Sequence, residues 1–171
     1  MHAHRSVRRD VDGLSISQGG AAAGPAPWRV SSRRLPFASM ATWDDVRRLA
    51  LALPETTEDL SHGHLFWRVR DKGFVWERPL RASDLKALGD AAPSGPILGA
   101  RVEHLVAKEA LLADDPDVFF TTPHFNGFPA VLVQLDRIVA GGLEEVVVEA
   151  WLARAPPRLA KEYLQTHSPP S

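Results

Sequence analysis

Histidines and the carboxylates near them are the residues of this sequence that could do acid–base or metal chemistry. His62 and His64 follow closely after Glu58 and Asp59, and His124 lies far along the chain. Neighbouring imidazoles and carboxylates can move protons or hold a transition metal. Their spacing matches no diagnostic ligand or catalytic motif, so polar residues at strand ends are the simpler interpretation. We therefore predict no catalytic residue, no metal site and no cofactor, and we expect that the protein is not an enzyme.

Phosphate binding is a second chemistry, suggested by a cluster of basic residues in the middle of the chain. Arg68 and Arg70 share one face of a predicted strand, Lys72 follows in the turn, and Arg78 and Arg81 come at and after the end of the return strand. Positive donors on such a hairpin can contact DNA phosphates, which need charge more than exact geometry. Two acidic residues lie among them, so an ordinary solvated face is the alternative interpretation.

Aromatic side chains could also stack on nucleic-acid bases. Most of them recur at core-facing positions, and we predict that they pack in the hydrophobic core. Phe125 and Phe128 are exceptions, because they flank Asn126-Gly127, where either a cross-strand pair or a partly exposed binding tip is sensible. The residues assigned to the core include Trp67, Phe74, Trp76, Phe119, Phe120 and Trp151.

Periodicity predicts the elements that position these residues. Thr42 is a good N-cap, and apolar residues from Trp43 to Leu53 repeat at helical spacing. Residues 64–70 and 74–78 alternate as the strands of a hairpin. The predicted turn is Asp71-Lys72-Gly73, in which Gly73 would supply a positive φ.

A second hairpin is predicted from Val118–Phe125 and Phe128–Leu135, joined by Asn126-Gly127, a pair favoured in type I′ turns. Pro129 lacks an amide, which places that strand end on a sheet edge or outside the ladder. If the two hairpins are adjacent, His64 and His124 could approach each other. Further helices are expected over 83–88, 107–113, 143–151 and after Pro157, with a strand over 97–103. This pattern predicts an α+β fold, a mainly antiparallel sheet with helices packed on one face.

Composition sets limits on location and partners. The 171 residues have a net charge of −1, but residues 1–39 carry six arginines against two aspartates (+4), and the remainder carries 14 Lys and Arg against 19 Asp and Glu (−5). A domain that is acidic overall is not an obvious polyanion binder. Cysteine is absent, which excludes disulfides, thiol catalysis and cysteine zinc sites. No apolar run approaches the roughly 20 residues that span a bilayer, and we expect a cytoplasmic protein without membrane contact.

The expected organisation is a single domain over residues 40–166. Residues 1–39 are rich in Ser, Gly, Ala, Pro and Arg and are predicted to be a disordered basic extension. Either Met40 is the natural start, or these residues form a real basic tail or a transit peptide. Residues 167–171 are predicted to be a short disordered tail.

Together these segments resemble the MmcQ/YjbR family of small bacterial proteins. The resemblance implies a CyaY-like α+β fold and DNA binding through two hairpins that act as paired wings. The wing residues it implies are Arg68, Arg70 and Lys72 on the first hairpin, with His124 and Asn126 on the second; Arg78 and Arg81 complete the predicted DNA-binding set. The segments that carry the resemblance are Leu53-Pro54-Glu55-Thr56, then Phe66, Val69, Lys72 and Phe74, then His124–Gly127 with Pro129–Val133, and Leu143–Trp151.

The acidic balance of the domain favours an alternative hypothesis. In it, the protein is a protein- or small-ligand-binding module that uses the sheet face or the Phe125–Phe128 tip and does not bind nucleic acid.

Overall fold

Helix α1 begins as its sequence predicts. The Thr42 hydroxyl accepts a hydrogen bond from the Asp45 backbone N–H (3.3 Å), and the Asp45 carboxylate accepts one from the Thr42 N–H (2.9 Å). This reciprocal capping box satisfies two amides that helix geometry leaves unpaired. Val46 and Ala50 then point into the core.

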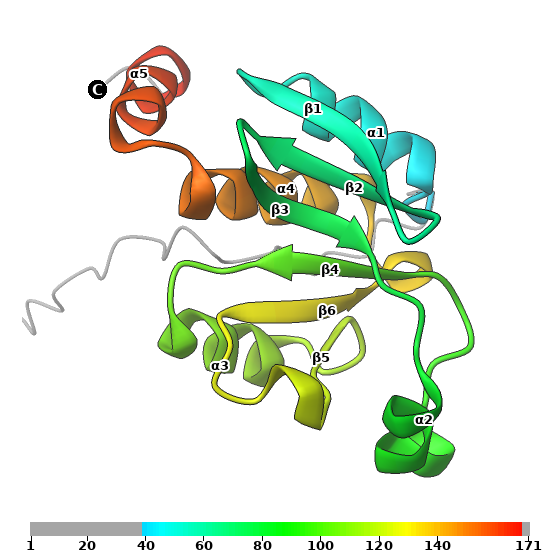
Figure 1. The fold of residues 1–171 in the computed structure, drawn as a ribbon. Helices are drawn as coiled ribbons and strands as arrows, with labels where there is room; N and C mark the ends of the chain where they lie inside the picture. The colour runs from blue at the N-terminus through cyan, green and yellow to red at the C-terminus, as the bar shows by residue number, and fades with distance from the viewer. Residues whose placement is uncertain (1–38, 169–171) are drawn as a thin grey trace, which may run out of the picture.

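The computed structural model describes residues 39–168 and shows six antiparallel strands in the order β1-β2-β3-β4-β6-β5 (Figure 1). The predictions for residues 1–38 and 169–171 lie outside the described residues. No helix within residues 39–168 has the length and apolar character needed to cross a membrane. The elements are α1 (Trp43–Leu51), β1 (Thr56–Ser61), β2 (His64–Val69), β3 (Lys72–Glu77), α2 (Ala82–Leu88), η1 (Gly89–Ala91), β4 (Ile97–Arg101), α3 (Leu105–Asp114), β5 (Phe119–Phe120), η2 (Pro123–Phe125), β6 (Ala130–Gln134), η3 (Leu135–Arg137), α4 (Ala140–Arg154) and α5 (Pro157–His167).

The first hairpin is confirmed, but its turn differs from the prediction. Arg70 has the positive φ (55°), and Gly73 lies inside β3. Strand β1, which the sequence did not predict, pairs with β2 from Thr56 opposite Val69 to Ser61 opposite His64. The edge strand β1, with β2 and β3, forms one half of the sheet.

The second hairpin is confirmed only in its antiparallel pairing. β5 has two residues, and residues 121–129 form a loop where a tight turn was predicted. Asn126 has a φ of −59°, so Asn126-Gly127 is not a type I′ turn. The loop is held from within, because the Phe125 side chain is buried and the Lys108 amino group donates to the carbonyls of Phe125 (2.6 Å) and Phe128 (3.1 Å).

The main core lies between the sheet and helices α1 and α4. In Figure 1, β2 and β3 pass in front of α4, so the view is onto the opposite face of the sheet, called the open face below. The α+β prediction is therefore confirmed, with α1 and α4 covering one face. The largest fully buried side chains include Trp67, Phe74, Leu98 and Trp151. Helix α5 follows α4 and packs Tyr163 against Trp151, with ring centroids 5.1 Å apart. It runs to His167, one residue beyond the predicted domain end.

Candidate functional site

Two aromatic rings pack together on the open face. Phe66 of β2 and Trp76 of β3 are directly opposite in the strand pair, and their rings stack with centroids 6.1 Å apart and planes 25° apart. Glycines make this possible. A Cβ added to Gly73 would lie within 3.0 Å of Phe66 ring carbons, and one added to Gly99 would lie 2.7 Å from Trp76 Cζ2. Gly73 leaves room for the Phe66 ring and Gly99 for the Trp76 ring, and the Arg68 guanidinium lies over the Phe66 ring at 5.0 Å. Both residues are half-buried, and we call them the aromatic platform.

A groove adjoins the platform. It has a volume of about 470 Å³ and is lined by side chains drawn from residues 61–66, 76–81 and 124–125, including both platform rings. This volume lies in the range of small-ligand sites, and the lining mixes aromatic, cationic and imidazole groups. The platform and groove together form the candidate site.

Three histidines line this groove. His62 belongs to the β1–β2 turn, His64 begins β2, and His124 comes from η2. The prediction that His64 and His124 could approach each other is supported to the extent that both line one groove. The His124 ring packs edge-on against Phe125, with centroids 5.0 Å apart. Among residues 39–168, no group of three or more histidine and carboxylate side chains could hold a metal ion.

A buried ion pair supports one wall of the groove. Arg78 donates to the Asp84 carboxylate at 2.9 Å, and both side chains are less than one-tenth exposed. Burial raises the pKa of Asp84, but hydrogen bonds from the Arg81 N–H (2.8 Å) and from Arg78 outweigh it and leave that pKa below its ordinary value. Arg78 thus fixes α2 against β3. The Arg81 side chain at the rim is exposed and has no acidic partner in the part of the chain that the structure describes.

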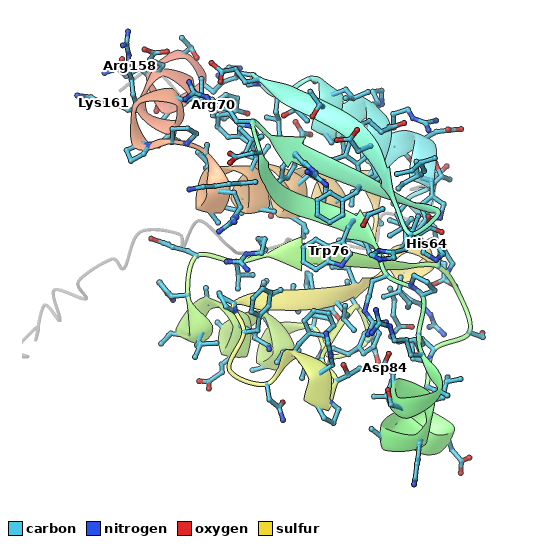
Figure 2. All side chains as sticks on the ribbon, in the orientation of Figure 1. His64, Arg70, Trp76, Asp84, Arg158 and Lys161 are labelled. Atoms are coloured by element: carbon cyan, nitrogen blue, oxygen red, sulfur yellow. The ribbon has the colours of Figure 1, made fainter. Side chains whose placement is uncertain are left out.

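The predicted DNA-contacting residues separate along the sheet. Arg78, Arg81 and His124 line the groove. Arg70 follows the end of β2 that lies away from the groove, at the same end of the molecule as α5 (Figure 2). Its guanidinium donates hydrogen bonds to the Glu55 carboxylate.

The remaining predicted residues, Arg68, Lys72 and Asn126, do not line the groove. Arg68 stacks over the Phe66 ring at 5.0 Å, with its Nε 3.7 Å from an Asp59 carboxylate oxygen and without a hydrogen bond. Lys72 is exposed at the start of β3, and Asn126 is exposed in loop 121–129. Only part of the predicted set is therefore brought together.

Sequence reasoning missed the platform. Trp76 was assigned to the core, and it does pack against a small buried cluster of Ile97, Phe125, Ala130 and Leu132, but it is only half-buried and also lines the groove. Phe66 was not considered as a stacking residue. Strand alternation does place Phe66 on the face of the sheet opposite to that of the buried Trp67, and this could have indicated that Phe66 lies outside the main core. The supporting glycines give no such signal, because their positions under the rings depend on strand register. The possibility of a partly exposed binding tip at Phe125 is wrong, because Phe125 is buried. Phe128 is 43% exposed.

Known proteins resemble this chain over most of its described part. A family model described as YjbR matches residues 51–153. The uncharacterized proteins Rv2570 of Mycobacterium tuberculosis and Mb2600 of Mycobacterium bovis are each 52% identical over 128 residues, covering 73% of this chain and 97% of each relative. The crystal structure of the Deinococcus radiodurans protein DR2400, with a DUF419 domain, matches at a TM-score of 0.53 and 20% identity, covering 77% of this chain and 91% of that one. At this identity the last match shows a shared fold alone.

Proposed function

This chain belongs to the YjbR family, and we propose that it is a non-enzymatic, cytoplasmic protein that binds single-stranded DNA on its open face. A base stacks on the Phe66–Trp76 platform, and neighbouring phosphates meet the cationic rim of the groove. The observation that carries the proposal is the pair of half-buried aromatic rings that pack over glycines and line the groove. Base–aromatic stacking contributes about 1–3 kcal/mol per base and tolerates any sequence.

The charges around the platform support a phosphate-bearing ligand. Arg81, His62 and His124 are exposed and line the groove, and Arg68 lies over Phe66. The net negative charge of the domain does not oppose this, because binding depends on the charge of the contacting face.

Unpaired DNA fits this face better than a duplex held between wings. A stacking platform needs bases whose faces are accessible, which a duplex does not offer. Among the wing residues, Arg70 is bonded to Glu55 and Arg68 has Asp59 at 3.7 Å, so two of the three cations on the first hairpin are partly neutralised.

Fluorescence anisotropy with the full chain tests the proposal. A labelled oligothymidylate of about twelve nucleotides and a duplex of the same length are titrated at several salt concentrations. The single strand should bind more tightly. Trp76→Leu should weaken its binding by about 1–3 kcal/mol, or roughly fivefold to a hundredfold. Tyr163→Leu, which removes a half-buried aromatic ring on α5, is the matched control.

Charge is tested separately from stacking. Arg81→Gln should reduce the slope of log affinity against log salt by about 0.7, the value for one phosphate contact on a single strand. Arg158→Gln, at an exposed arginine on α5, should leave the slope unchanged. Absence of single-strand binding at low salt, or equal binding by wild type and Trp76→Leu, would contradict the proposal. Binding of a free nucleotide alone would favour the small-ligand alternative, for which the groove volume is suitable.

A further inference from the structure

The carboxylate of Glu77 is the one acidic group that lines the groove. It is the last residue of β3, directly after the platform residue Trp76, and its side chain is 30% exposed. A carboxylate works against phosphate binding by charge. Its presence beside the arginine and histidine side chains of the groove, whose other lining residues are mostly apolar or aromatic, therefore needs another explanation.

Local contacts involve one oxygen of this carboxylate and leave the other without a hydrogen-bond donor among the described residues. Glu77 Oε2 accepts a hydrogen bond from the Leu65 backbone N–H at 3.1 Å and lies 3.7 Å from His64 Nδ1. Glu77 Oε1 accepts no hydrogen bond from any residue between 39 and 168. An ionised carboxylate can accept about four hydrogen bonds, so an oriented acceptor remains available at the groove.

We infer that Glu77 recognises guanine, so that the base held in this groove is preferentially guanine. Guanine presents two neighbouring donors, N1–H and the exocyclic N2–H, which a carboxylate can accept as a pair. Its O6 is an acceptor next to N1, and the His64 imidazole beside Glu77 can supply the matching donor. This inference rests on the proposed function for the presence of a stacked base, and it adds the identity of that base.

The other three bases fit the carboxylate less well. Adenine and cytosine place a ring-nitrogen acceptor beside their amino donor, and thymine places a carbonyl on each side of its N3–H. With any of these, one carboxylate oxygen would face a lone pair. A site built to pair with a ligand donor rejects ligands that lack it, because its own polar group is left unpaired.

The test uses the full chain and oligothymidylates that differ only in one central base, G, A, C or T. The oligonucleotide with guanine should bind about fivefold to a hundredfold more tightly than the other three, the range for one good bidentate pair. Glu77→Gln should make the four affinities converge. The glutamine carbonyl can still accept from the Leu65 N–H, and unchanged thermal unfolding would confirm that the fold is kept. Glu144→Gln, which removes an exposed carboxylate on α4, should retain the guanine preference.

Guanosine 5′-monophosphate, measured by calorimetry with wild type and Glu77→Gln, separates the two proposals. Oligonucleotide binding without a guanine preference, or a preference that survives in Glu77→Gln, would overturn the inference while leaving single-strand binding intact. Binding of the free nucleotide that depends on Glu77, without binding of any strand, would support guanine recognition and overturn the strand proposal. Binding of neither ligand would overturn both.

Discussion

Gly99→Ala tests whether the platform depends on glycine beneath the rings. The added methyl group would lie 2.7 Å from Trp76 Cζ2 and closer to two other ring atoms. Carbon atoms pack at about 3.5–4.0 Å, so the indole must move away from β4 by roughly 1 Å. The ring is bounded by Phe66 on one side, so it has to tilt out of the stacked arrangement.

The expected cost follows from packing and backbone terms. Overpacking costs about 1–3 kcal/mol, and alanine regains about 0.5–1 kcal/mol over glycine within a strand. We expect a net loss of about 1–2 kcal/mol in the free energy of unfolding, and loss of most of the stacking contribution to oligothymidylate affinity.

Urea unfolding and fluorescence anisotropy measure the two effects on the same preparation. Gly141→Ala is the control, because Gly141 is exposed in α4 and a Cβ there would meet nothing within 4 Å. That change should stabilise the fold by about 0.5–1 kcal/mol and leave DNA affinity unchanged. If Gly99→Ala were as stable as wild type and bound equally well, the reasoning that the Trp76 ring packs directly over Gly99 would be refuted.

Three further predictions concern buried charges. Asp84→Asn should destabilise the fold by about 3 kcal/mol or more, because Arg78 stays buried without its partner. The Asp84 pKa is lowered in the fold, so the ionised carboxylate contributes its full stabilisation above the ordinary aspartate pKa near 3.9. That stabilisation is lost as pH falls through the lower folded pKa. If wild type remained more stable than Asp84→Asn in strong acid, this reasoning would be contradicted. Burial, with nearby carboxylates, raises the pKa of Glu149, which means that its ionised form destabilises the fold. Glu149→Gln should therefore raise the melting temperature at about pH 8. This gain in melting temperature should vanish below the ordinary glutamate pKa near 4.3, where the carboxyl group is protonated in both states. An equal gain at both pH values would exclude the ionised carboxylate as its cause. Lys108→Met leaves two loop carbonyls without their donor and should cost about 2 kcal/mol and speed proteolysis of loop 121–129, whereas Lys86→Met on the exposed side of α2 should do neither.

Elements whose own residues determine their geometry were predictable. Thr42 and Asp45 cap α1 by contacts three residues apart, and the apolar spacing within α1 and α4 is visible in any short window. Strand β2 alternates clearly because Trp67 and Val69 are buried while their neighbours are not. Strand β1 was missed because it is an edge strand of mostly polar residues, whose one large apolar side chain, Leu60, is 70% exposed.

The tight turn predicted for the second hairpin is wrong because of tertiary contacts. Asn126-Gly127 has a strong local preference for a tight turn. In the fold, burial of Phe125 and the two hydrogen bonds from Lys108 outweigh that preference, and both depend on partners distant in sequence. The candidate site has the same character. Arg78, Arg81 and His124 could be named from the sequence, but the platform depends on which glycine lies under which ring.

The indole N–H resonance of Trp76 gives the most direct test of single-strand binding on the platform. It can be assigned as the signal missing from the spectrum of Trp76→Leu, and it is followed by NMR while the full chain is titrated with oligothymidylate. A stacked base should shift this signal strongly and saturably, while the signals of the fully buried Trp67 and Trp151 stay nearly in place. Saturating binding without a shift at Trp76 would contradict the account, because DNA would then contact another part of the protein.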